Sequence, residues 1–462
     1  MSTSNLPCKS HWKIGIARRV ITPPPQVELA GLGYYLNRTS ERIHDDLTAT
    51  ALVIEDERRQ CVVIVALDLM YCDESFTSSI RQRASMQTNI RPEAICVNCS
   101  HSHNAPTAGF IRGAGEINPN YLETVSDKAV ESIVEAWKKR EPATLRVGKA
   151  EVEGLTINRT RENGQVDTRL SVLRADTLQG KPLAMIINFH SHLTAHFEIN
   201  MRAISRDWPG ELVDQVEVKL PGITAMYLQG TCGDVNLRPE FNNTERRFEP
   251  ALVLTQKTLT AWEESQPVAN STATAVAHKI TLPTRRWTRE EIMRDRGEAL
   301  YRLNTGDIVG WLNGFASVIV GVPKRLPLRY GGDVKKAVAA VSRFAVEWTD
   351  AILPDLEIRP EKIETEVQAI RVGDVWFAAH SSELFTSLGL AVRSRWPHRN
   401  LFMLGYSNGS IGYLADAHDI DRKSYAAYQS PKFTGQFPFT VESGDAMVQG
   451  LLNVLEQTTS NG

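Results

Sequence analysis

Short apolar runs rich in β-branched residues recur along the chain, and each has the length of a buried β-strand. Polar and turn-forming residues separate these runs. The runs are Cys61–Leu67, Ala94–Cys99, Ala184–Phe189, Thr224–Leu228, Val372–Ala379 and Leu401–Leu404. We expect each of them to form a strand.

Helical patterns alternate with these runs. Asn118 and Pro119 are typical of a helix cap followed by proline at the first helical position. From Leu122 to Trp137 the apolar residues then follow at helical spacing. A second helix is expected over Trp208–Val218. This alternation predicts an α/β fold with mixed β-sheets flanked by helices.

The segment from about residue 288 to 353 differs from the rest of the chain. It carries dense charge and few strand signals, and helical patterning is clearest from Lys335 to Ala351. We expect a helical insertion at 288–353, either a wall or lid over a site or a peripheral helical pair without a role. With no internal repeat or low-complexity linker, we expect residues 1–462 to form a single domain.

The overall composition is that of an ordinary globular protein. Of the 462 residues, 42% are hydrophobic and 23% are charged, and the formal net charge is -2. This charge provides no strong field for nucleic acid or for an anionic membrane. We therefore expect a small-molecule substrate and no nucleic acid.

Three features bear on location. Residues 1–15 contain no apolar segment typical of a secretory signal. Runs such as Cys61–Leu67 are far too short to span a bilayer. Cys96 and Cys99 form a C-x-x-C in a predicted strand, where the two side chains point to opposite faces and do not suit one metal. We expect buried reduced thiols, a cytoplasmic location and no integral membrane segment. The sequence is also compatible with a homo-oligomer.

The sharpest chemical signal is a His-x-His pair that directly follows the run Ala94–Cys99. In a strand, residues i and i+2 point to the same face, so His101 and His103 can converge on one point. Alternatively, one binds a metal while the other contacts a substrate. The simplest structural explanation is two polar residues at a strand end.

A second histidine cluster follows the run Ala184–Phe189. It contains His190, His192 and His196, three of the eleven histidines of the chain. Two histidine-bearing strand ends can meet at one edge of a sheet, which favours a zinc site. The spacing does not choose among these three residues.

Three further segments follow predicted strands. Residues 229–236 contain a glycine turn, Glu383 follows Ser381-Ser382, and Tyr413 ends the segment 407–413. Taken singly, the glycine segment is explained by an ordinary turn, Glu383 by a solvated carboxylate, and Tyr413 by a half-buried packed tyrosine.

Together, these segments resemble the neutral (non-lysosomal) ceramidase family, specifically its N-terminal catalytic domain. Each match is short, but their shared order covers most of the chain. The matching segments are Gly15–Arg18 with Ile21-Thr22-Pro23, Leu29–Tyr34, the strand ending in Asp68, His101–Pro106, Asn158-Arg159 and Ser205–Gly210.

The resemblance implies a ceramidase-like catalytic fold and selects particular residues. It implies a zinc ion held by His101, His192, Glu383 and Tyr413. His103 would face the reacting carbonyl of the substrate. The family's other polar site residues are matched by Arg159 and Tyr425, the latter twelve positions after Tyr413.

Two departures from the family pattern concern the substrate. The family has a serine in Gly-Asp-Val-Ser, where this chain has Asn236. Asparagine cannot form an alkoxide nucleophile, although it can donate a hydrogen bond to an oxyanion. The family also has a C-terminal β-sandwich domain, which we do not expect here because only about fifty residues follow Tyr413. Both departures argue against ceramide as the substrate.

The sequence therefore predicts a zinc-dependent hydrolase, an amidase or esterase, that uses metal-activated water on a small polar substrate. His103 and Tyr425 would stabilise an oxyanion or protonate the leaving group, and Arg159 would hold a carboxylate or polar head. Asp207 and Asp234 would orient the histidine ligands, with a helix-cap role as the alternative for Asp207.

Three other functions remain open. The same metal suits a lyase or isomerase acting on a hydroxy-carbonyl compound. True ceramidase-type N-acyl amide hydrolysis is the second alternative, and a non-catalytic binding protein is the third.

Overall fold

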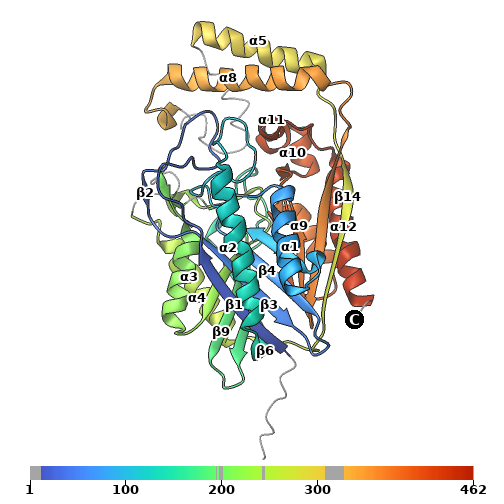
Figure 1. Cartoon of the computed structure of the whole chain (residues 1–462). Coiled ribbons are helices and arrows are strands. Elements are labelled where there is room, and N and C mark those ends of the chain that lie inside the picture. The colour runs from blue at the N-terminus through green and yellow to red at the C-terminus, as the bar shows by residue number, and fades with distance from the viewer. Residues whose placement is uncertain (1–11, 194, 197–200, 242–244, 307–326, 461–462) are drawn as a thin grey trace, which may run out of the picture.

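Two β-sheets packed face to face form the body of the protein in this computed structural model (Figure 1). The structure describes residues 12–193, 195–196, 201–241, 245–306 and 327–460. The larger sheet has the order β11-β9-β8-β6-β1-β3-β4-β5, with β13 beside β6, and the smaller has the order β14-β15-β16-β18.

Parallel and antiparallel pairs occur in both sheets, which confirms the predicted mixed sheets. β4 and β5 are parallel, as are β9 with β11 and β16 with β18. The strands of the larger sheet are β1 (Trp12–Val20), β3 (Thr48–Glu55), β4 (Cys61–Leu67), β5 (Ile95–Cys99), β6 (Glu141–Glu151), β8 (Arg169–Thr177), β9 (Pro182–Phe189), β11 (Thr224–Gln229) and β13 (Gln266–Pro267). Those of the smaller sheet are β14 (Ala273–Pro283), β15 (Lys362–Val372), β16 (Val375–His380) and β18 (Leu401–Leu404).

Helices cover the outer faces of this pair of sheets. α2 lies over β1 and β3 with α1 packed beside it, α3 and α4 cover the β6–β11 half, and α9 and α12 cover the smaller sheet (Figure 1). The helices are α1 (Glu74–Thr88), α2 (Pro119–Lys138), α3 (Trp208–Lys219), α4 (Glu249–Glu263), α5 (Arg289–Thr305), α8 (Val334–Ile352), α9 (Thr386–Arg395), α10 (Ala417–Asp421), α11 (Ser430–Thr434) and α12 (Val441–Ser460).

α2 shows how the sequence sets a helix and its packing. The side chain of Asn118 accepts a hydrogen bond from the Tyr121 amide at 3.1 Å, which confirms the predicted cap. The buried residues Val125, Ala129 and Ile133 share one face. A Cβ at Gly15 of β1 would lie 1.9 Å from the Ala136 carbonyl oxygen, so glycine permits this close contact.

The smaller sheet packs on both faces because its strands alternate. Phe377 and Ile370 belong to the core between the two sheets, whereas Trp376 and Ala369 pack in the core beneath α12. Buried amides also join the sheets. Asn98 of β5 donates to the Gly405 carbonyl at 2.6 Å and accepts from the Gln229 amide at 2.9 Å.

One predicted element needs correction. The run Val372–Ala379 is the end of β15, a tight turn at Gly373, which has a positive φ of 61°, and then β16. At the end of the described chain, α12 continues as far as Ser460, and its residues Leu455 and Thr458 are buried.

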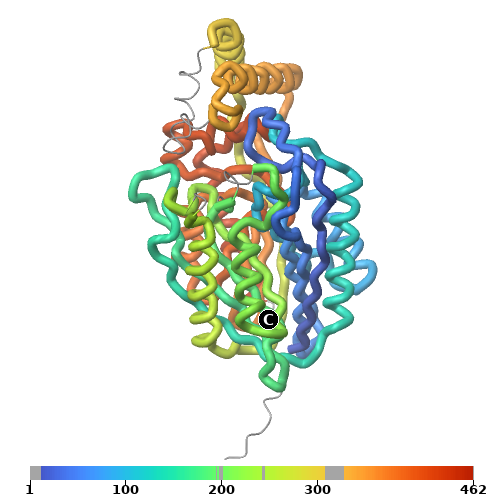
Figure 2. Tube along the Cα trace, turned by 90° about the vertical axis from the view of Figure 1, so that its left-hand side faces the viewer, coloured from blue at the N-terminus to red at the C-terminus, as the bar shows by residue number. Residues whose placement is uncertain are grey.

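The predicted helical segment is confirmed for its described part. α5 and α8 pack side by side and form what we call the cap, which projects beyond the body at one end of the molecule (Figures 1 and 2). Residues 307–326 of the predicted insertion lie outside the described residues.

Candidate metal centre and active site

The predicted site residues follow strands whose carboxyl ends lie at one edge of the two sheets. His101 follows β5, His192 follows β9, and Asn236 lies beyond β11. Glu383 and Tyr413 follow β16 and β18 of the smaller sheet. Because β4–β5, β9–β11 and β16–β18 are parallel pairs, these strand ends converge.

His101 lies beyond the end of β5 in the left-handed backbone conformation, with a φ of 70°. This conformation costs about 1–2 kcal/mol in a non-glycine residue. The His101 amide donates to the Leu69 carbonyl at 2.9 Å, and its Nδ1 lies 3.0 Å from the Met70 carbonyl oxygen. The imidazole therefore carries its proton on Nδ1 and presents Nε2 to the site.

His192 is held in the same way. Its Nδ1 lies 2.7 Å from the carbonyl oxygen of Cys232 and 3.1 Å from that of Val235, so Nε2 again faces the site. These carbonyls occupy the place predicted for Asp207 and Asp234, and that prediction is wrong.

The two aspartates have structural roles. Asp207 caps α3 by accepting from the Trp208 amide, and it also accepts from the His196 amide at 2.9 Å. Asp234 accepts from the Thr386 amide and from the Asn158 side chain. The alternative cap role of Asp207 is therefore the correct one.

The other two histidines of the second cluster lie elsewhere. His190 accepts from the Thr231 amide at 3.0 Å and lies 3.5 Å from the Asp167 carboxylate. Nε2 of His196 lies 3.1 Å from Glu211. The direction of the backbone after β9 brings His192, and not His190 or His196, to the site. The spacing of the three histidines in the sequence did not reveal this direction.

Glu383 and Tyr413 are direct partners in a short parallel ladder between β17 (Glu383–Leu384) and β19 (Tyr413–Leu414). Oε2 of Glu383 lies 3.4 Å from Nε2 of His101 and 3.4 Å from Nε2 of His192. The Tyr413 hydroxyl is also 3.4 Å from Nε2 of His192. We call these four residues the metal centre.

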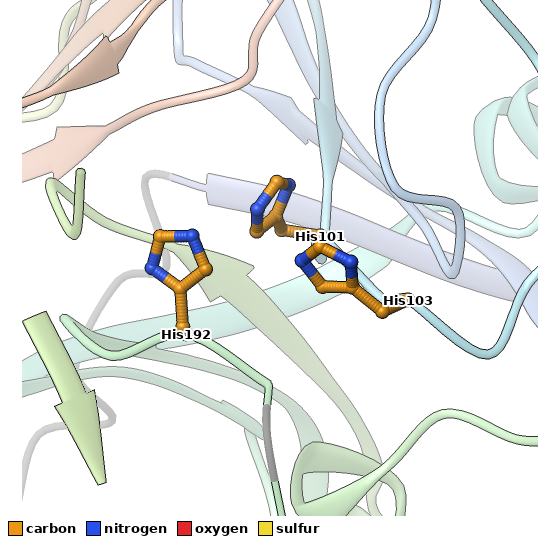
Figure 3. A group of neighbouring side chains, drawn as sticks. All are labelled: His101, His103 and His192. Carbon is orange, nitrogen blue, oxygen red and sulfur yellow. The ribbon is translucent and has the colours of Figure 1, made fainter. Parts of the chain in front are cut away.

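His103 completes the group of imidazoles. Ligand atoms of His101, His103 and His192 all lie within 4.8 Å of one another, and Figure 3 shows the three rings around a common space. A Cβ at Gly31, which has a φ of 74°, would lie 2.5 Å from Nδ1 of His103, so only glycine leaves room for this ring. Convergence of His101 and His103 was predicted, but it arises from a turn beyond the strand and not from strand periodicity.

Arg159 and Asn236 meet beside Tyr413. The antiparallel pairing of β7 (Thr156–Asn158) with β12 (Val235–Leu237) brings them together. The guanidinium donates to the Tyr413 hydroxyl at 2.7 Å, to the Gly233 carbonyl at 2.7 Å and to Oδ1 of Asn236 at 3.3 Å. Arg159 thus fixes the side chains of Tyr413 and Asn236. Because Oδ1 of Asn236 accepts from Arg159, Asn236 can offer its side-chain NH₂ as a donor to a substrate.

Tyr425 lies on the side of the site that faces the cap. Its ring centroid is 6.1 Å from that of Tyr413, and it begins a single π-helical turn, Tyr425–Gln429. Tyr425 also packs 6.3 Å from Phe433, which contacts Phe344 of α8 at 4.5 Å. We call Tyr34, Phe344, Phe433 and Tyr425 the aromatic bridge.

Burial keeps the imidazoles neutral. It lowers the pKa of His101 to about 3 and holds the pKa values of His103 and His192 well below the ordinary range. Burial also raises the pKa of Tyr413 well above its usual value, although Arg159 acts in the opposite direction. These side chains therefore present uncharged nitrogen and phenol groups beside the carboxylate.

This donor set fits a divalent metal such as zinc. Nε2 of His101 is buried and makes no hydrogen bond with any described residue. Two imidazole nitrogens, one carboxylate and a phenol oxygen surround the same space, and both imidazoles are oriented through their other nitrogen.

Tyr406 is a site residue that the sequence did not reveal. Its ring stacks on His101 with centroids 4.0 Å apart, and its hydroxyl lies 3.2 Å from the Cys232 sulfur and 3.4 Å from Glu383. Its position just after β18 was the available signal, but a tyrosine after a strand is common.

Comparisons with known proteins agree with this architecture. Residues 12–220 match the family model described as neutral/alkaline non-lysosomal ceramidase, N-terminal. Neutral ceramidase A of Dictyostelium discoideum is 26% identical over 262 residues, which cover 49% of this chain and 36% of that protein. The match thus spans about a third of the curated relative.

Two solved structures share the fold. The crystal structure of neutral ceramidase from Pseudomonas aeruginosa matches with a TM-score of 0.72 and 16% identity, covering 98% of this chain and 75% of that one. A ceramidase complexed with C2 matches with a TM-score of 0.73 and 15% identity, covering 98% and 76%.

The fold, with mixed sheets flanked by helices, is thus similar to that of the solved neutral ceramidase. The predicted resemblance to the neutral/alkaline non-lysosomal ceramidases is confirmed. Within the described residues, no helix combines the length and apolar character needed to cross a membrane.

Proposed function

We propose that this protein is a zinc-dependent hydrolase that cleaves an amide or ester bond with metal-activated water. The observation that carries the proposal is the convergence of His101, His192 and Glu383, in which one carboxylate oxygen lies 3.4 Å from both imidazole Nε2 atoms. Tyr413 would be the fourth ligand. When bound, zinc lowers the pKa of a water molecule and polarises the scissile carbonyl.

The surrounding residues have distinct roles in this proposal. His103, neutral and beside the metal centre, would face the reacting carbonyl, take up the proton that the attacking water loses and pass it to the leaving group. Arg159 positions Tyr413, and Asn236 donates a hydrogen bond to the developing oxyanion. Tyr425 provides a second hydroxyl on the cap side of the site.

The substrate proposed is a small polar compound and not ceramide. Asn236 stands where the related ceramidases carry serine, and it has no hydroxyl to act as a nucleophile.

We also propose that the body and the cap act as one catalytic unit, since the aromatic bridge links Phe344 to Tyr425. A cytoplasmic location is proposed because the five described cysteines are all unbridged.

The test uses the full-length protein loaded with zinc and screened against panels of amides, esters and lactones. We expect turnover that a chelator removes and that added Zn²⁺ restores. In ¹⁸O-labelled water, one labelled oxygen should enter the product. Turnover without incorporation of label would contradict hydrolysis and favour a lyase or isomerase. Cleavage of ceramide in preference to the panels would contradict the proposed substrate class.

A further inference from the structure

A second group of potential metal ligands lies apart from the metal centre, where three segments of the chain meet. His44 follows β2 (Arg42–Ile43), His196 lies on the segment after β9, and Glu211 is in the first turn of α3. One ligand atom from each lies within 4.8 Å of the others.

Backbone pairing brings the segments together independently of any ligand. β2 runs parallel to β10 (Ala203–Ile204), with Ala203 opposite Arg42. The His44 amide donates to the Ile204 carbonyl at 2.8 Å, while Asp207 accepts from the His196 amide at 2.9 Å and caps α3. The cluster is therefore held on ordered backbone.

His196 is the residue that points to a ligand. It is 0% exposed, and neither of its ring nitrogens makes a hydrogen bond with a described residue. Its Nε2 forms an ion pair with Oε1 of Glu211 at 3.1 Å, while its Nδ1 and Oε2 of Glu211 are buried without a hydrogen bond to a described residue. A buried polar group without a partner costs about 1–3 kcal/mol, which a bound cation would offset.

The local charge favours a cation on this imidazole. Burial acts to lower the pKa of His196, but the carboxylates of Glu211 and Asp207 outweigh it, and the pKa is raised. Arg247 acts in the opposite direction and is outweighed as well. A metal ion competes with the proton for an imidazole nitrogen of His196, and the same carboxylates attract both.

We propose that His44, His196 and Glu211 form a second divalent-cation site, suited to zinc, outside the metal centre. Two imidazoles and one carboxylate are ligands that zinc accepts, and water completes a four-coordinate shell. His44 is exposed, so an ion reaches the site from solvent. A bound ion ties β2 and α3 to the segment that also carries His192. This site stands independently of the proposed hydrolase function.

The test is a zinc titration of the full-length protein after removal of metal by a chelator, with bound metal counted by mass spectrometry. We expect two equivalents of Zn²⁺ per chain. His44→Ala and Glu211→Gln should each lose one equivalent and retain the other. His278→Ala is the matched control, because His278 is an exposed histidine on β14 hydrogen-bonded to Gln457, and it should retain two.

Two further variants separate this site from the metal centre. His101→Ala should lose one equivalent, and the double variant His44→Ala/His101→Ala should lose both. Because His44 is exposed, its replacement leaves the core unchanged, and circular dichroism confirms folding. An unchanged zinc count in both His44→Ala and Glu211→Gln would overturn the second site and leave an ion pair between His196 and Glu211. An unchanged count in His101→Ala alone would overturn the metal centre instead.

Discussion

The metal centre and the cap are joined by the aromatic bridge, yet different interactions hold them in place. The Nδ1 atoms of His101 and His192 face backbone carbonyls next to strand ends. The orientation of both imidazole rings therefore depends on the main chain. The cap is held mainly by side chains. Phe344 packs against Tyr34 and Phe433, and Lys432 lies 4.9 Å from the Trp348 ring.

This difference indicates which region tolerates change. A ligand fixed by the main chain keeps its place when neighbouring side chains vary, because the carbonyls that orient it remain. A helix docked through side chains moves when one of them is truncated. We therefore expect metal binding to be insensitive to the cap, and substrate selectivity to depend on it.

The largest effect should come from the metal centre itself. His192→Ala removes one imidazole from the donor set, so we expect loss of the metal at this site and a fall in kcat of at least about 10³-fold, or ~4 kcal/mol. Metal analysis and steady-state kinetics measure both. His190→Ala is not equivalent, because His190 faces Asp167, and it should keep the metal. Retention of the metal at this site in His192→Ala would contradict the ligand assignment.

Truncation in the cap comes next. Phe344 is fully buried, so Phe344→Ala should lower the free energy of unfolding by about 3–5 kcal/mol. The centre should nevertheless keep its zinc. Denaturant unfolding and metal analysis test the two statements separately. Loss of zinc in this variant would show that the cap helps to build the metal centre.

Arg159 tests the positioning of Tyr413 without removing a ligand. Arg159→Met should lower kcat about 10–100-fold and leave KM closer to its original value, as expected for a partner that orients a ligand. Arg161→Met is the control, since Arg161 pairs with Asp416 and not with the centre. A rise in KM alone would instead support the predicted contact of Arg159 with the substrate.

The smallest effect within a single pH unit concerns His380, which ends β16 close to the centre. Burial lowers the pKa of His380 to about 3, below about 6.5 in an unfolded chain. The unfolded state therefore takes up the proton first, and stability is lost as the pH falls from about 6.5 to 3, by at most about 1.4 kcal/mol per pH unit.

Replacement of His380 should remove this part of the pH dependence. The difference in free energy of unfolding between the protein and His380→Gln should shrink on acidification across that window. His278→Gln provides the comparison at an exposed position. A constant difference from pH 7 to 4 for His380→Gln would contradict the assigned pKa.

Much of the fold was predictable because local signals were strong. The strands Cys61–Leu67 and Leu401–Leu404 have the predicted bounds, and the Asn118 cap with Pro119 fixes the start of α2. The turn at Gly373 was missed although Gly373-Asp374 interrupts the apolar run and is itself a turn signal. The residues of the candidate site were named from family resemblance, while the roles of their neighbours Asp207 and Asp234 were partly wrong.

The sequence by itself determined the alternation of strands and helices, the two histidine clusters and the order of motifs shared with the ceramidases. These features are local, since apolar spacing, caps and short motifs are written in consecutive residues. Only the tertiary structure decided that His192 and not His190 or His196 reaches the centre, that backbone carbonyls orient the imidazoles, and that Tyr406 stacks on His101. Those outcomes depend on the direction of the chain after each strand and on contacts across hundreds of positions, which no local pattern specifies.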